Sequence, residues 1–142
     1  MEQNFKNHTR FLLSYHVILT LLLLSGLIGS FVNLYQSIGT DNLYDASLLL
    51  LLFVCCIILF WLTRAFPLKA QDRAIRAEEN FRHFILSGKP LPKGLKINQI
   101  IALRFASDEE FLDLVQKALA ENMSNKAIKL LIKNWKPDYH RV

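Results

Sequence analysis

Cysteine is scarce in this 142-residue chain, and its two cysteines, Cys55 and Cys56, are neighbours. Adjacent cysteines are poorly placed for an unstrained disulfide. A lone pair without further cysteine or histidine partners also lacks the ligand spacing of a zinc site. We therefore expect neither a disulfide scaffold nor a zinc module, and we interpret both residues as small apolar side chains rather than redox or palmitoylation sites.

Charge is absent from two long apolar segments, residues 11–35 and 46–63. The chain is 52% hydrophobic, which is more than one soluble core of this length can bury. A helix needs about 20 mainly apolar residues to cross a bilayer. We predict an N-terminal unit, residues 1–66, with membrane spans at about 12–35 and 46–63. A cleaved signal peptide is the alternative for the first segment, but the run is long and no clear cleavage site ends it.

Lysine and arginine are lacking between the two spans, where Asp41 and Asp45 lie. Lys6 and Arg10 precede the first span, and four basic residues follow the second: Arg64, Lys69, Arg73 and Arg76. Positive residues stay on the cytoplasmic side of a membrane. The pattern therefore predicts a helical hairpin with both termini in the cytoplasm.

Catalytic and cofactor motifs are missing from the sequence as well. It contains no phosphate-binding glycine loop, HExxH, GxSxG or Cys/His metal spacing. His83 and His140 have no evident partner, and the acids of "SDEE" at 107–110 suit the start of a helix. No ionisable residue lies in the middle of a span, where transporters carry them. We expect a non-enzymatic protein with no catalytic residue, metal or cofactor; an enzyme or transporter is the less supported class.

Four small residues occupy the middle of the first span. Ser25 is four residues from Gly29, and Gly26 is four residues from Ser30. Small residues at this spacing share a helix face and let a neighbouring backbone approach closely. This predicted helix-packing interface contacts either the second span of the same chain, which is the simpler prediction, or a partner protein.

Glycine is absent from residues 67–87, and "SGKPLPKG" follows. We predict that residues 67–88 form a cytoplasmic helix, the stalk, which continues the second span or begins anew at Pro67. Acid–base pairs at i, i+4, Asp72 with Arg76 and Glu78 with Arg82, support a helix.

An apolar stripe follows the stalk with a spacing of 4, 3, 4 and 3 residues, close to a heptad seam. Its members are Ala70, Ala74, Ala77, Phe81 and Phe84. The stripe packs on a partner, on a second copy or on the chain's own C-terminal part, and the last is our default.

Residues 89–142 are predicted to be a linker and a small helical headpiece that leans on the stalk. Three short helices are expected here: Ser107 and Glu110 form a capping-box pattern before the second, and Ser124 can cap the third, which Pro137 ends. This last helix and its flank carry a basic surface: Lys126, Lys129, Lys133, Lys136 and Arg141. It is a solvated face, a site for anionic lipid headgroups, or a nucleic-acid site; the last has least support, because no aromatic stacking set or arginine-rich recognition helix accompanies it.

The strings "NFKNHTRF", "LKAQDRAIRAEENFRHF", "QIIALRFASDEEF" and "IKNWKPDYHRV" resemble a family of small bacterial membrane proteins of unknown function. The resemblance covers nearly the whole chain. It implies a two-span bacterial inner-membrane protein with a cytoplasmic C-terminal part, and it brings no activity, cofactor or site residue.

The sequence thus predicts an all-α protein: a transmembrane hairpin, a helical stalk and a small helical headpiece. We expect an accessory or scaffold subunit of a larger bacterial inner-membrane complex. Its expected partners are membrane lipid and either other membrane subunits or a second copy. The alternative is a membrane-anchored module that binds anionic lipid or nucleic acid through its basic C-terminal helix.

Overall fold

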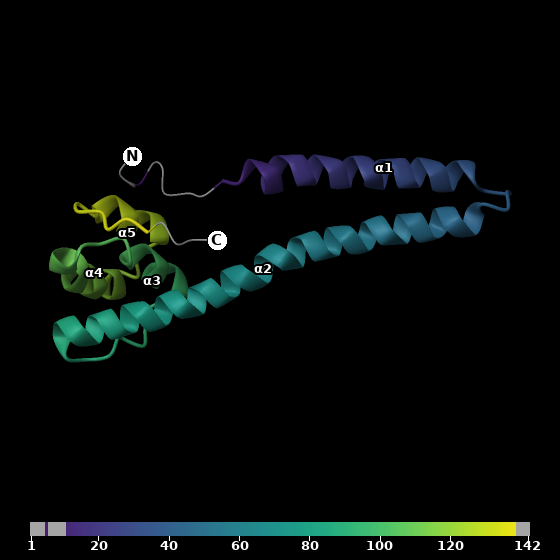
Figure 1. Ribbon diagram of the computed structural model, residues 1–142. Helices are drawn as coiled ribbons and strands as arrows, with labels where there is room; N and C mark the ends of the chain where they lie inside the picture. The colour runs from purple at the N-terminus through teal and green to yellow at the C-terminus, as the bar shows by residue number, and fades with distance from the viewer. Residues whose placement is uncertain (1–4, 6–10, 139–142) are drawn as a thin grey trace. The chain divides into compact units, whose positions relative to one another are not determined.

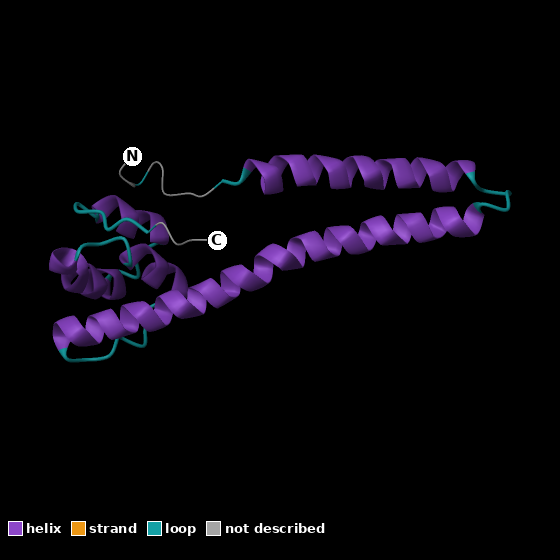
Figure 2. Cartoon of the chain, viewed as in Figure 1, coloured by secondary structure: helices purple, strands orange, loops and turns teal. Residues whose placement is uncertain are grey.

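The computed structural model describes residue 5 and residues 11–138, and these residues form helices and loops without a strand (Figures 1 and 2). The elements in chain order are a π-helix η1 (Ser14–Leu19) and the α-helices α1 (Thr20–Gln36), α2 (Leu43–Ser87), α3 (Ile97–Leu103), α4 (Asp108–Ala120) and α5 (Asn125–Leu131). The predicted all-α class is confirmed. Lys6, Arg10, His140 and Arg141, which carried predictions above, lie outside the described residues.

The chain divides into two compact units, and α2 contributes residues to both. We call residues 11–66 the apolar unit and the chain from Pro67 onward the C-terminal unit. The two units are described separately below.

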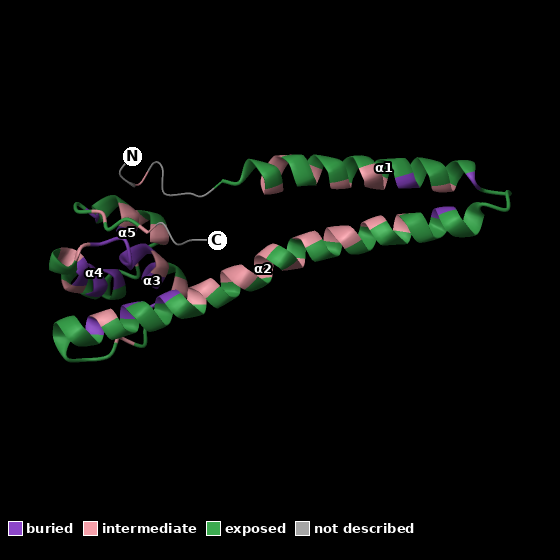
Figure 3. Cartoon of the chain, in the orientation of Figure 1, coloured by how far each residue is buried: buried purple, intermediate pink, exposed green. Residues whose placement is uncertain are grey.

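Most residues of the apolar unit are exposed or half-buried (Figure 3). The exposed residues include most of its large apolar side chains, and the buried ones are small. Its buried residues are Ser30, Ser37 and Ala46. The segment Ser14–Gln36 and helix α2 are each long and apolar enough to cross a membrane, and only 6% of the most apolar window of each is buried. The core helix of a soluble protein would be mostly buried, and these two apolar windows are not.

Polar side chains of the apolar unit bond to their own backbone. The hydroxyl of Thr20 donates to the carbonyl of Tyr15 at 3.3 Å, and that of Ser30 donates to the carbonyl of Leu27 at 2.8 Å. The Tyr15 hydroxyl donates to the carbonyl of Phe60 at 2.5 Å, and the two rings stack at 4.5 Å. Such internal bonding is what a lipid environment requires of polar groups.

Helix α2 continues through Pro67 and ends at Ser87. The alternative that Pro67 begins a separate helix is therefore wrong, whereas the stop at the Gly/Pro-rich sequence is confirmed. Gly88 takes a left-handed φ of 71°, which glycine adopts without steric cost. The linker then returns along α2, where the Asn80 side-chain carbonyl accepts a hydrogen bond from the Leu91 backbone N–H at 2.8 Å.

The C-terminal unit has one hydrophobic core, to which Ile75 of α2 and residues of α3, α4 and α5 contribute. The predicted leaning of the headpiece on the stalk is confirmed by this shared core. Gln99 of α3 is buried, and its side-chain amide donates to the carbonyls of Ala118 and Met123 at 3.2 and 2.9 Å. These bonds tie α3 to the end of α4, where Asn122 adopts φ 45° just past the helix.

Candidate functional site

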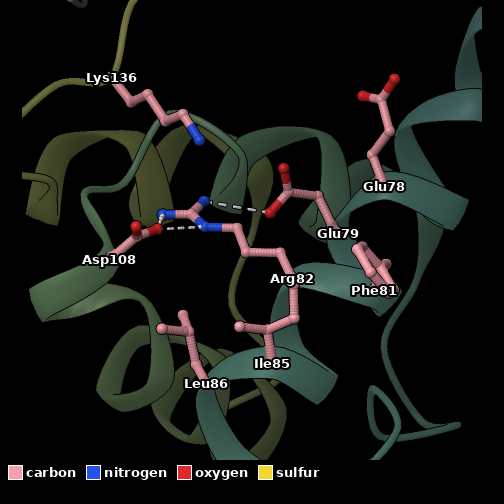
Figure 4. Close-up of a pocket in the computed structure, with 8 residues that line it drawn as sticks. All are labelled: Glu78, Glu79, Phe81, Arg82, Ile85, Leu86, Asp108 and Lys136. Carbon is pink, nitrogen blue, oxygen red and sulfur yellow. Dashed lines mark hydrogen bonds and ion pairs between the residues drawn. The ribbon is translucent and has the colours of Figure 1, made fainter.

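An open pocket of about 280 Å³ lies in the C-terminal unit and is centred on Arg82 (Figure 4). Helix α2 supplies most of its lining, the start of α4 supplies an acid, and the segment after α5 supplies a lysine. The lining residues are Glu78, Glu79, Phe81, Arg82, Ile85, Leu86, Asp108 and Lys136. The pocket therefore combines a compact charge cluster with an apolar rim.

All three nitrogens of the Arg82 guanidinium have acceptors. Nε and Nη2 both lie 2.6 Å from an Asp108 carboxylate oxygen, Nη1 donates to Glu79 at 3.2 Å, and Nη2 donates to the Ala106 carbonyl at 2.7 Å. The guanidinium carbon also lies 4.3 Å from the centre of the Phe111 ring. Arg82 thus joins α2 to the loop before α4 and to α4 itself.

The predicted pairing of Glu78 with Arg82 is wrong. Glu78 is exposed and points away from the guanidinium (Figure 4), whereas Glu79 is buried and takes the bond. The reason is geometric: Arg82 turns toward the core side of α2, which is the side of Glu79. No ion pair joins Asp72 and Arg76 among the described residues.

Burial raises the pKa of the Glu79 carboxyl above its ordinary value. The Arg82 charge and its hydrogen bond act in the opposite direction, with smaller contributions from Lys136 and Arg104, but they do not cancel the effect of burial. The side chains of Glu79 and Arg82 are 9% and 11% exposed. Removal of either partner would leave the other charge in a poorly solvated position, which is costly.

The small-residue face of α1 is divided between two environments. Gly26 lies against Phe53 of α2, because a Cβ built on Gly26 would come within 2.0 Å of that ring, and Ser30 is buried. Ser25 and Gly29 are exposed, and a Cβ on Gly29 would meet nothing within 4 Å. Half of the predicted interface therefore packs within the chain, and half is open.

The predicted stalk stripe is exposed along its whole length. All five members, Ala70, Ala74, Ala77, Phe81 and Phe84, lie on the surface of the C-terminal unit. The face of α2 that enters the core carries Ile75, Glu79 and His83 instead. Our default, in which the stripe packs on the chain's own C-terminal part, is wrong; a partner and a second copy are the alternatives that stay open.

The predicted basic surface does not form one helical face. Lys126 and Lys129 lie on α5, but α5 ends at Leu131, and Lys133 and Lys136 follow it in a non-helical segment. Lys129 is half-buried, with its amine 5.4 Å from the centre of the Phe105 ring. The other three lysines are exposed, so the four differ in burial, and only two of them lie on α5.

Glu110 explains why α5 ends early. Its carboxylate accepts hydrogen bonds from the backbone N–H groups of Lys133 and Asn134 at 3.1 and 3.0 Å. The Lys136 N–H donates to the Phe105 carbonyl at 2.8 Å, and the Ser107 N–H donates to the Asn134 carbonyl at 3.1 Å. The segment after α5 is thus held against the loop before α4.

The predicted capping box of Ser107 and Glu110 is wrong. Ser107 is the N-cap residue of α4 by its backbone, but its side chain makes no capping hydrogen bond. Glu110, the other half of the predicted box, is occupied by the segment after α5. In contrast, the predicted cap at Ser124 is confirmed, because its hydroxyl accepts the Ala127 N–H at 3.2 Å.

Four polar residues make structural contacts that the sequence did not predict: Glu79, Arg82, Gln99 and Glu110. Gln99 and Glu110 each precede a buried apolar residue, Ile100 and Phe111, which is a weak signal in the sequence. Glu79 and Arg82 have no such neighbour. Among the described residues, no group of three or more His, Cys, Asp or Glu side chains is placed to hold a metal ion.

Comparison with protein-family models places the chain in a family of unknown function (DUF6526), whose model matches residues 1–142. The chain belongs to this family, so the resemblance to a family of unknown function is confirmed. Searches of curated proteins and of solved structures gave no match.

Proposed function

We propose that the chain is a non-enzymatic integral membrane protein that acts as an accessory or scaffold subunit of a larger complex in the bacterial inner membrane. Two long, apolar and exposed helices support a membrane location. In this proposal they form a transmembrane hairpin, and the basic residues that follow the second span keep the C-terminal unit in the cytoplasm.

The proposed scaffold role is based on the open half of the small-residue face, where another helix could pack. Gly26 is filled by Phe53 of the same chain, but Gly29 and Ser25 leave a shallow, unoccupied strip on α1. Lipid tails are as apolar as leucine, so helices in a membrane associate mainly where small residues permit close packing. A helix of another subunit would find such packing at Gly29.

Gentle extraction and affinity purification of the full chain from its native membrane tests the proposal. We expect other membrane subunits to co-purify, and we expect Gly29→Leu to release them. Ile28→Leu is the matched control, because Ile28 is also exposed, at 63%, and the change adds no bulk to the strip. Recovery of the chain without any membrane subunit, or an unchanged set with Gly29→Leu, would contradict the proposal at this surface.

We do not advance the binding of anionic lipid or nucleic acid as a second function. That idea required the lysines to line one face of the last helix, and they lie partly on α5 and partly beyond it. The same purification would reveal it, because the chain would then be recovered with lipid or nucleic acid and without protein subunits.

A further inference from the structure

The exposed stripe on α2 is unusual for a helix outside the apolar unit. Phe81 and Phe84 are 65% and 53% exposed, and the neighbouring Ile85 is 65% exposed. The opposite face of the same helix enters the core of the C-terminal unit. The stripe is therefore a continuous apolar face that no described part of the chain covers.

The stripe has the geometry of a coiled-coil seam. In a heptad register Ala74 and Phe81 occupy a positions, and Ala70, Ala77 and Phe84 occupy d positions. The buried residues of this helix, Ile75, Glu79 and His83, then fall at b, f and c, away from the seam. The C-terminal unit thus covers the back of the helix and leaves a and d free for a second helix.

The flanking charges favour one particular partner. Arg73 occupies a g position and Glu78 the following e position; both are exposed, and neither belongs to an ion pair within the described residues. In a parallel pair of identical helices, g of one helix lies beside the following e of the other. Arg73 of each copy would then face Glu78 of the other copy.

An antiparallel pair lacks this complementarity. It would place g beside g, and the g positions of this stretch are Phe66, Arg73, Asn80 and Ser87, none of which is acidic. We therefore propose that a second copy of this chain docks in parallel on the stripe, with two symmetric Arg73–Glu78 pairs across the interface.

This proposal rests on the membrane location in the proposed function. Two heptads with three alanines make a short, weak seam in free solution. Anchoring both copies in one membrane raises their effective concentration and makes their α2 helices run in the same direction. The alanines allow close approach of the two backbones next to the membrane, and the phenylalanines supply apolar area farther along.

Cysteine cross-linking of the full chain in sealed native membranes tests the proposal. Cys55 and Cys56 are first replaced by alanine, and then Ala77→Cys is compared with Arg76→Cys, a position that is also exposed but lies at c. In a parallel symmetric pair each d residue lies beside its own copy. We expect mild oxidation to convert most of the Ala77→Cys chain into a covalent dimer and to leave the Arg76→Cys chain monomeric.

Charge reversals then test the register. Arg73→Glu and Glu78→Arg are each expected to lower the cross-linked fraction of the Ala77→Cys chain by about threefold, the effect of losing exposed ion pairs. The double variant is expected to restore it, which a general loss of folding would not do. Equal cross-linking at positions 76 and 77, no cross-linking at either, or no restoration by the double reversal would overturn the proposal.

Alkaline extraction of the same membranes separates the two proposals. A chain that stays in the membrane but does not cross-link at position 77 contradicts only the dimer. A chain that washes out of the membrane contradicts the proposed function, and the dimer proposal falls with it.

Discussion

The two units of this molecule follow opposite burial rules. The C-terminal unit buries Phe105, Phe111 and Ile100, whereas the apolar unit buries two serines and an alanine and exposes most of its leucines and phenylalanines. Leu22 of α1 is 62% exposed and Leu130 of α5 is 61% exposed, so the exposure of a single leucine does not distinguish the two units. The difference lies in the neighbours: Leu22 belongs to a continuous apolar surface, whereas Leu130 lies on a short helix whose surface also carries Lys126 and Lys129. A surface of the first kind indicates a lipid solvent rather than water.

The largest effect is expected in the C-terminal unit, from Arg82→Met. This change leaves Glu79 buried without its partner, which costs about 3–5 kcal/mol of unfolding free energy. Arg76→Met is the control, because Arg76 is exposed and its loss removes no ion pair among the described residues. Urea unfolding of the detergent-solubilised chain, followed by Trp135 fluorescence in a Trp61→Phe background, measures both. Equal stability of the two variants would show that the Arg82 cluster does not hold α2 to α4.

The next largest effect separates the two kinds of exposed leucine. Leu22→Arg places a charge near the middle of the first span and should cost about 2.5–3.5 kcal/mol of insertion free energy. Leu130→Arg should stay within about 0.5 kcal/mol of the native chain, as surface changes in water do. The fraction of chain that resists alkaline extraction, together with the unfolding curve, measures the pair. If both substitutions were tolerated equally well, the distinction between the two units would be refuted.

The two glycines of α1 give a smaller contrast within the apolar unit. Gly26→Leu must displace the Phe53 ring and should destabilise the packing of α1 on α2 by about 1–3 kcal/mol. Gly29→Leu enters open space and should leave the melting temperature of the purified chain unchanged. Phe53→Ala added to Gly26→Leu should recover part of the loss, because the smaller side chain vacates the space. A loss of stability with Gly29→Leu instead would mean that both halves of the face pack within the chain.

The smallest effect concerns pH. Because burial raises the pKa of Glu79, the folded chain holds this proton more tightly than the unfolded chain does. The resulting stabilisation is fully present below the ordinary glutamate pKa, and it is lost as pH rises through the raised pKa of the folded state. Glu79→Gln lacks this titration, so melting temperatures should show the native chain losing stability relative to the variant from acid to neutral pH. The opposite trend would mean that the attraction of Arg82 outweighs burial.

Sequence patterns predicted most of the helices but not the contacts between them. Long uncharged runs and Gly/Pro stops depend on local chemistry, so α1, the end of α2 and the cap at Ser124 were predictable. The partner of Arg82 is 26 residues away at Asp108, and a choice between Glu78 and Glu79 depends on which face of α2 is buried. The hydropathy pattern predicted that the Ala/Phe stripe is the buried face of α2, whereas the face that enters the core contains Glu79 and His83.

The end of α5 was unpredictable for a related reason. Residues 125–135 have good helical spacing, but Glu110 offers two acceptors to the backbone of Lys133 and Asn134. A long-range contact thus overrides a local preference, and it also removes Glu110 from the capping role that the local pattern gives it.

Sided labelling of single cysteines in sealed inner-membrane vesicles tests the central claim most directly. With Cys55 and Cys56 replaced by alanine, Asp41→Cys reports on the connection between α1 and α2, and Gln116→Cys reports on the exposed surface of α4. A two-span protein predicts that a membrane-impermeant maleimide labels these two positions from opposite sides. Labelling of both positions from the same side would contradict the transmembrane hairpin.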